Sequence, residues 1–124
     1  MSPNTPNDEQ VVRVRRLEIV DAEGRVRAVV GDLAPAEADS PDFGLALLDA
    51  QGARRAWVSL GPHGPAVGLD HSGNSVAEMG VTDAGGDALG TGAYLVLSDA
   101  TGGLAIGWWV EEDGSVTIRT APRR

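Results

Sequence analysis

The chain contains no cysteine and no lysine among its 124 residues. Without cysteine there is no disulfide, no thiolate metal ligand and no cysteine nucleophile, and such a chain is typical of a reducing compartment. Without lysine there is no Schiff-base residue and no lysine for a phosphate-binding loop. These absences exclude several classes of enzyme, and we expect a cytoplasmic protein.

Aromatic residues and long apolar runs are also scarce. Only 4% of the chain is aromatic although 42% is hydrophobic, so a core must be built from Val, Leu, Ile and Ala. No run approaches the ~20 apolar residues of a membrane span. Residues 1–10 have neither the basic start nor the apolar stretch of a secretory signal. We therefore expect no membrane partner.

Basic residues are missing from most of the chain. All ten are arginines, none lies between residues 56 and 118, and the net charge is −8. An acidic body disfavours binding to a phosphate backbone, which argues against nucleic acid as a partner. The simplest role of the charge is to keep the protein soluble.

The most informative feature present is a repeated turn with the pattern Asp-Ala-x-Gly. Three copies span residues 21–24, 49–52 and 99–102, and a looser copy, Asp-His-Ser-Gly, spans residues 70–73. Asp at the first position of a type I turn accepts hydrogen bonds from backbone N–H groups ahead of it, and Gly at the fourth position adopts positive φ without strain. The predicted hairpin turns are held by Asp21 and Gly24, Asp49 and Gly52, Asp70 and Gly73, and Asp99 and Gly102.

Apolar and polar residues alternate on both sides of these turns, which is the strand pattern. The predicted strands cover residues 11–20 with a break near Arg15 and Arg16, then 26–30, 44–48, 53–60, 66–69, 74–81, 93–97, 104–110 and 115–119. The sequence thus predicts an all-β chain of about nine strands in serial antiparallel hairpins. The spacing of the turn aspartates varies, so an irregular β-solenoid, a prism completed between subunits and a barrel-like or sandwich meander stay open.

The chain is short enough for one domain, which we place at residues 11–120. Residues 1–10 read as a disordered polar tail and residues 121–124 as a frayed one. The longest linker, residues 31–43, has room for a short helical turn at 34–38. Residues 82–92 form a glycine-rich loop.

Residues 17–30 and 45–58 share the pattern Leu-x-Leu/Ile-x-Asp-x-x-Gly-x-x-Arg-Ala-x-Val. This pattern resembles a β-hairpin repeat of uncharacterised bacterial proteins. The resemblance covers residues 17–30 and 45–60 well and 93–107 in part, and the third hairpin departs from it around Val76 and Glu78. It implies repeated β-structure and carries no activity.

Groups that could carry chemistry are few. His63 and His71, with Asp70, Glu78 and Asp83 nearby in sequence, could form a two-His, one-carboxylate metal set. Both histidines fall in connections, however, and the spacing is not that of metal ligands. Turn chemistry also accounts for the acidic stretches at 83–87 and 111–115. We expect no catalytic residue, no metal and no cofactor, and hence no enzyme.

The three tryptophans are the largest side chains available. Trp108 and Trp109 are adjacent on one predicted strand, so they point to opposite faces. Trp108 shares its face with Leu104, Ile106 and Val110, and we expect it in the subunit core. Trp109 has few large apolar neighbours on its face of the strand. We expect it, together with Trp57, to be exposed as a subunit interface or a ligand platform.

These features favour a non-catalytic structural or protein-interaction module that assembles with itself as a homo-oligomer or binds another protein. The alternative is a β module that binds a small molecule or carbohydrate through exposed tryptophan.

Overall fold

The computed structural model describes residues 10–33, 42–62, 64–82 and 92–121. These residues form nine β-strands: β1 (Arg16–Val20), β2 (Val26–Asp32), β3 (Phe43–Leu48), β4 (Arg54–Gly61), β5 (Gly64–His71), β6 (Asn74–Thr82), β7 (Gly92–Ser98), β8 (Leu104–Glu111) and β9 (Val116–Thr120). The predicted helical turn at 34–38 and His63 lie outside the described residues, as do most of the two predicted tails and of the loop at 82–92.

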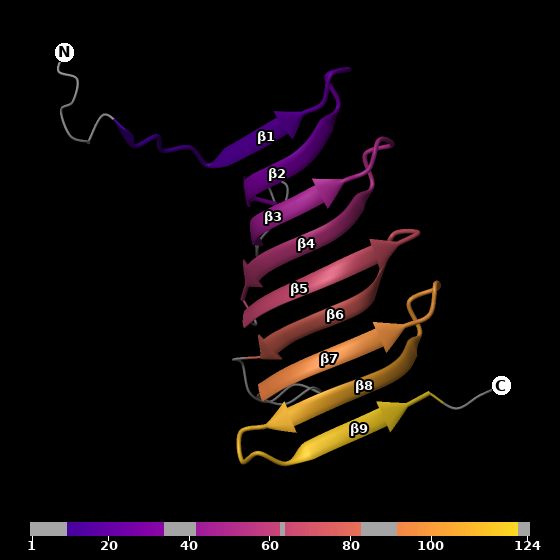
Figure 1. Cartoon of the computed structure of the whole chain (residues 1–124). Helices are drawn as coiled ribbons and strands as arrows, with labels where there is room; N and C mark the ends of the chain where they lie inside the picture. The colour runs from indigo at the N-terminus through magenta and orange to yellow at the C-terminus, as the bar shows by residue number, and fades with distance from the viewer. Residues whose placement is uncertain (1–9, 34–41, 63, 83–91, 122–124) are drawn as a thin grey trace.

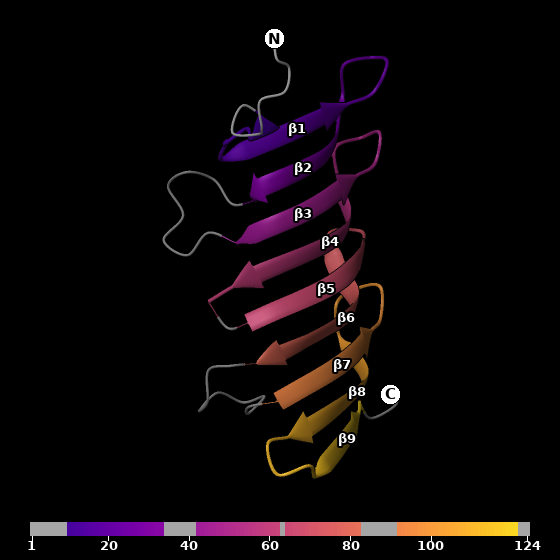
Figure 2. The same cartoon turned by 60° about the vertical axis from the view of Figure 1, so that its left-hand side comes forward.

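All nine strands belong to one antiparallel sheet in which each strand pairs with its neighbours in sequence, from β1 at one edge to β9 at the other (Figure 1). The prediction of an all-β chain with about nine antiparallel strands is confirmed. The sheet is open, and a second view shows the strands following one another in a single layer (Figure 2). The described part of the chain therefore does not close on itself as a barrel. No helix in that part is long and apolar enough to cross a membrane.

The Asp-Ala-x-Gly turns connect β1 to β2, β3 to β4 and β7 to β8. In the second of these, Oδ1 of Asp49 accepts hydrogen bonds of 3.0 Å from the N–H groups of Gln51 and Ala53, and Gly52 has φ +86°. The carboxylates of Asp21 and Asp99 accept bonds from the same two positions of their own turns. The three turns lie at the same end of the sheet (Figure 1).

The third hairpin turns differently from the prediction. His71 pairs with Asn74, so the loop between β5 and β6 has two residues, Ser72 at φ 53° and Gly73 at φ 81°. Two consecutive positive φ angles are typical of a type I′ turn, whose twist matches that of the strands without a side-chain cap. The carboxylate of Asp70 is therefore not used in the turn, and it lies instead on one face of the sheet.

One face of the sheet is apolar in every strand. Residues that pair directly across neighbouring strands share a face. One such ladder contains Leu17, Val30, Leu45, Val58, Val67, Met79, Leu95, Trp108 and Ile118, and the next contains Ile19, Ala28, Leu47, Ala56, Leu69, Ala77, Leu97 and Ile106. Together with Phe43, Leu60, Pro65, Val81, Ala93, Val110 and Val116, these residues form what we call the apolar face.

The opposite face, here the mixed face, combines small, aromatic and charged side chains. Its two central ladders contain Glu18, Val29, Ala46, Trp57, Gly68, Glu78, Val96, Gly107 and Arg119, and Arg16, Gly31, Gly44, Ser59, Ala66, Gly80, Tyr94, Trp109 and Thr117. All four buried hydrophobic residues of the described part, Val29, Ala46, Trp57 and Trp109, lie on this face.

This arrangement reverses the expected surroundings of the two adjacent tryptophans. Trp109 is only 7% exposed, so the expectation that it would lie exposed is wrong. Its ring folds back over Gly107, two residues earlier on the same face, where an added Cβ would come within 2.3 Å of the ring. Trp108 is half-buried on the apolar face rather than enclosed in a core of its own subunit.

Replacing the turn glycine Gly52 by alanine should destabilise the fold by about 1 kcal/mol, because positive φ then carries a Cβ penalty. No atom lies within 4 Å of the added methyl group, so the effect is conformational and not steric. Gly52→Asn is the control: asparagine tolerates the left-handed region and should recover part of the loss. Urea unfolding measures both variants, and equal losses would contradict this explanation.

Candidate functional site

Two aromatic side chains of the mixed face lie over the glycines with which they pair. Trp57 on β4 covers Gly68 on β5, and a Cβ at Gly68 would stand 2.3 Å from the indole ring. Tyr94 on β7 covers Gly80 on β6, where a Cβ would stand 2.7 Å from the phenol oxygen. The missing glycine side chains leave room for the rings to lie down on the sheet.

Asp70 fixes the indole of Trp57. Its Oδ1 accepts hydrogen bonds from Nε1 of Trp57 at 3.0 Å and from the Ser75 hydroxyl at 2.8 Å, and its Oδ2 accepts one from Nε of Arg54 at 2.6 Å. The Arg54 guanidinium also lies 5.0 Å from the centroid of the Trp57 ring, within cation–π range. The Asp70 side chain is 4% exposed, so a charge that would be costly alone is held by three donors.

These contacts set the protonation state of Asp70. Burial by itself raises the pKa of this carboxyl, but the hydrogen bonds from Arg54, Ser75 and Trp57 outweigh it, and the pKa lies below its ordinary value. Asp70 therefore stays ionised at neutral pH. It acts as an anchor for the neighbouring side chains rather than as a general acid.

A second polar pair lies further along the mixed face. The Tyr94 hydroxyl donates a 2.6 Å hydrogen bond to Oε2 of Glu78. Burial, followed by the hydrogen bond and the negative charge of Glu78, raises the pKa of Tyr94 well above its usual range. The phenol is thus protonated at all physiological pH values and holds the carboxylate of Glu78 in place.

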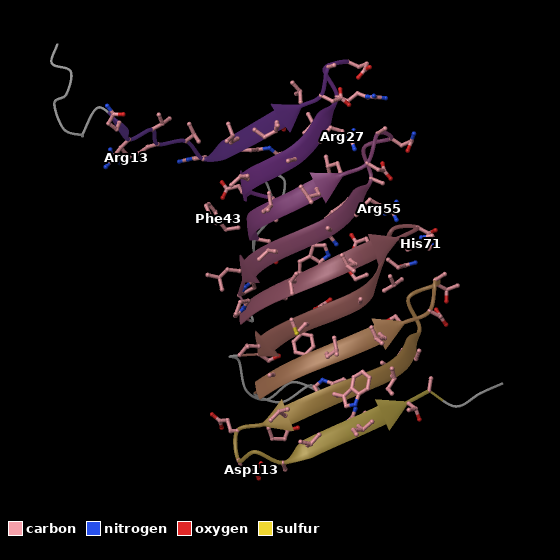
Figure 3. The ribbon with its side chains drawn as sticks, in the orientation of Figure 1. Arg13, Arg27, Phe43, Arg55, His71 and Asp113 are labelled. Carbon is pink, nitrogen blue, oxygen red and sulfur yellow. The ribbon has the colours of Figure 1, made fainter. Side chains whose placement is uncertain are left out.

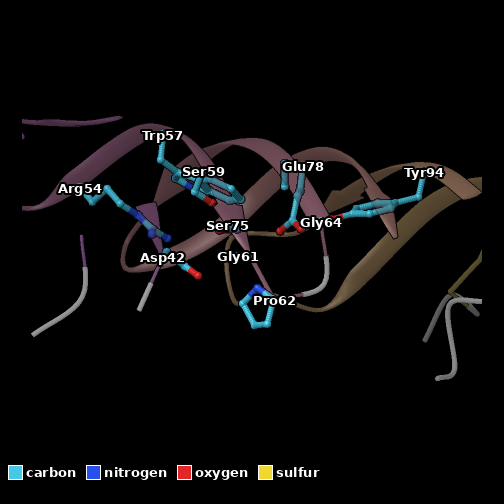
Figure 4. A pocket seen from close by; sticks show the side chains of 11 residues that line it. Asp42, Arg54, Trp57, Ser59, Gly61, Pro62, Gly64, Ser75, Glu78 and Tyr94 are labelled. Carbon is cyan, nitrogen blue, oxygen red and sulfur yellow. Dashed lines mark hydrogen bonds between the residues drawn. The ribbon is translucent and has the colours of Figure 1, made fainter. Parts of the chain in front are cut away.

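A pocket of about 310 Å³ lies between these two groups. Trp57 and Arg54 stand at one end of it, Tyr94 at the other, and Glu78 in between; Asp42 and Pro62 complete the rim (Figure 4). Its floor is made of small residues, among them Ser59, Gly64 and Ala66. Two carboxylates, Asp42 and Glu78, and one guanidinium, Arg54, are among the groups that line it.

Of the residues considered for metal binding, the three that the structure describes are not brought together. His71 is exposed at the turn end of β5 (Figure 3), whereas Asp70 points to Trp57 and Glu78 to Tyr94. His63 and Asp83 lie outside the described residues. Within the described part, no three His, Cys, Asp or Glu side chains are placed to hold a metal ion. That the chain binds no metal stays a prediction.

The sequence singled out Trp57 but not its neighbours. Trp57 is 8% exposed, so it cannot serve as an exposed platform, although its side chain lines the pocket. Glu78 is considered in the sequence only as a metal ligand, and Arg54 and Tyr94 are not candidates there. The three side chains meet only through the cross-strand register.

The second candidate surface is the apolar face. Its larger side chains, Trp108 and Ile106 excepted, are between 36% and 60% exposed, with Val67 the most covered and Val116 the least. A contiguous apolar surface that spans every strand of a sheet is unusual on a soluble monomer.

The acid sensitivity of the fold follows from its aspartates. Stability should hold above about pH 5 and fall progressively below about pH 4, because carboxyls with a lowered folded-state pKa add stability only above their unfolded pKa. Asp49→Asn should make the loss in acid less steep, since asparagine accepts the turn hydrogen bonds but does not titrate. Melting temperature against pH measures both effects, and identical curves would contradict the assignment. The carboxyls with a lowered pKa are Asp21, Asp49, Asp70, Asp99 and Asp113.

No protein-family model matches this chain, and no curated protein or solved structure matches it either.

Proposed function

We propose that the protein is a non-catalytic structural module that assembles with copies of itself through the apolar face of its sheet. The observation that carries the proposal is the pair of uninterrupted apolar ladders, which contain no charged or polar side chain from β1 to β8. A sheet apolar on one face normally buries that face against another layer.

The described part of the chain supplies no such layer. Its strands form one sheet, and no large side chain in it is less than 2% exposed. Most of the apolar surface that should stabilise this fold is therefore still in contact with solvent in a single copy. A partner that covers the face would supply the missing core.

A second copy of the chain is the partner that fits best. The exposed side chains of the apolar face present on the order of 1,000 Å² per copy, so two copies would bury an area in the range of permanent homodimers. The two central ladders are uncharged along their whole length, and the carboxylate of Asp32 lies only at the end of β2, beside Phe43. The centre of the face can therefore meet itself without opposing like charges. Two such sheets pack about 10 Å apart with their strands nearly aligned.

The assembly also accounts for the charge distribution. Packing the apolar faces together leaves the mixed face and the turn aspartates in solvent, where the net charge of −8 keeps the assembly soluble. The smallest product is a two-sheet sandwich, and three copies would form a prism. In either form the core lies between subunits rather than within one chain.

The test is the mass of the full chain in solution over a wide range of concentrations, measured by sedimentation or light scattering. We expect a multiple of 12.8 kDa that persists at micromolar concentration. A stable, folded monomer under these conditions would refute the proposal.

A further inference from the structure

The pocket on the mixed face lies opposite the surface proposed for assembly, so it stays open to solvent in the assembled protein. We propose that this pocket binds a neutral polyhydroxylated ligand, a single sugar ring, held by Glu78, Asp42 and Arg54. The inference is independent of assembly, because every residue in it belongs to one copy.

The size of the pocket limits the ligand. A volume of about 310 Å³ is at the lower end of the range for small-molecule sites. The small residues of the floor create this space: Ser59, Ala66 and Gly64 lie where larger side chains would fill it. One ring fits there, and a longer chain would have to extend over the rim.

The charges around the pocket limit the class of ligand. Asp42 and Glu78 are carboxylates, whereas Arg54 is a guanidinium on the same rim. A small anion would meet the two carboxylates as like charges. The charge of Arg54 is already compensated by Asp70, so an organic cation can pair with the carboxylates, but it offers no acceptor to the terminal nitrogens of Arg54. Hydroxyl groups suit this lining, since each can donate to a carboxylate and accept from an arginine.

The polar groups are also held in place before a ligand arrives. Oε2 of Glu78 accepts the Tyr94 hydrogen bond, which orients Oε1 as a further acceptor. Arg54 binds Asp70 through Nε, and its terminal nitrogens are additional donors. The rings of Trp57 and Tyr94 lie over Gly68 and Gly80, and both side chains line the pocket beside these polar groups. Recognition is therefore by hydrogen bonds between preorganised groups.

The test is a titration of the full chain, labelled with ¹⁵N, with glucose, galactose and N-acetylglucosamine, followed by NMR. A neutral sugar should give saturable shifts at the Trp57 indole N–H and at the amides of Gly61 and Gly64, and should leave the Trp108 indole unmoved. Glu78→Gln should weaken binding about tenfold, the loss expected for one hydrogen bond to a charged acceptor.

The matched control is Glu18→Gln, the same change on the same face at β1, which should leave the affinity unchanged. The inference is overturned if none of the three sugars gives saturable shifts at the pocket. It is also overturned if the pocket responds only to choline or only to citrate, because the site would then select a charge. A monomeric mass would leave this result unaffected.

Discussion

Val58→Glu should break the assembly apart. Val58 lies in the middle of an apolar ladder, paired with Leu45 on one side and Val67 on the other, and it is 53% exposed in the single copy. If a second sheet covers this face, the new carboxylate is buried without a partner. We expect association to weaken by about 100-fold or more, measured as a shift of mass toward the monomer.

Val14→Glu is the matched control. Val14 precedes β1, is 62% exposed and lies outside the apolar face, so the same substitution should change neither the mass nor the stability. If the apolar face were solvent-exposed in the working protein, Val58→Glu would behave in the same way, with an effect within about 0.5 kcal/mol. That result would rule out the assembly.

If the core lies between copies, a substitution that separates them can also unfold the single chain. Val58→Thr distinguishes loss of association from loss of fold, because a buried hydroxyl disturbs the interface less than a buried charge. It should lower the association constant and keep the β-sheet signal in circular dichroism. Loss of that signal with unchanged association would show that Val58 supports the fold alone.

Local sequence signals were sufficient to predict nine strands and three of the four turns that begin with aspartate. The first strand was predicted too long, since residues 11–15 do not belong to β1, which begins at Arg16. The Asp-Ala-x-Gly pattern fixes both the capping carboxylate and the residue with positive φ, and each needs only four neighbouring residues. Residues 70–73 are compatible with two kinds of turn, one capped by Asp70 and one of two residues with positive φ. Ser72 and Gly73 formed a two-residue turn, and Asp70 was left free to bind Trp57.

The alternation of side chains along β8 predicts correctly which residues share a face of the sheet. It does not predict which of the two faces is covered. Trp109 is buried because glycine at position 107 leaves space for its ring, and Trp108 lies in the uncovered ladder. Burial depends on the neighbouring strands and on the partner layer, and neither is written in the alternation. For the same reason the sequence did not predict whether the sheet closes into a barrel; in the structure it is open.

The contact of Trp57 with Gly68 is predictable from the sequence. Gly61 pairs with Gly64 across a two-residue loop, and counting back from that loop sets Trp57 opposite Gly68. The register of a tight hairpin is thus readable from its turn. Tyr94 and Gly80 lie on either side of a long connection instead, so no such count was available for them.

Gly68→Ala should be among the most damaging small substitutions in the chain. The new Cβ would stand 2.3 Å from the Trp57 ring, and the backbone at Gly68 does not have positive φ, so the conflict is steric. The ring must leave its place, and Asp70 then loses the hydrogen bond from Nε1. We expect a loss of about 3 kcal/mol, from overpacking together with the loss of one of the three hydrogen bonds to the buried carboxylate.

A double-mutant cycle isolates this contact. Trp57→Ala alone should cost about 3–5 kcal/mol, as expected for truncation of a buried aromatic side chain. In that background Gly68→Ala should cost almost nothing, and could add about 0.5 kcal/mol, because alanine is better tolerated than glycine inside a strand. Urea unfolding of the four proteins gives the coupling energy. Additive losses would mean that the ring of Trp57 does not occupy the space above Gly68, and that the end of the proposed sugar site at Trp57 is built differently.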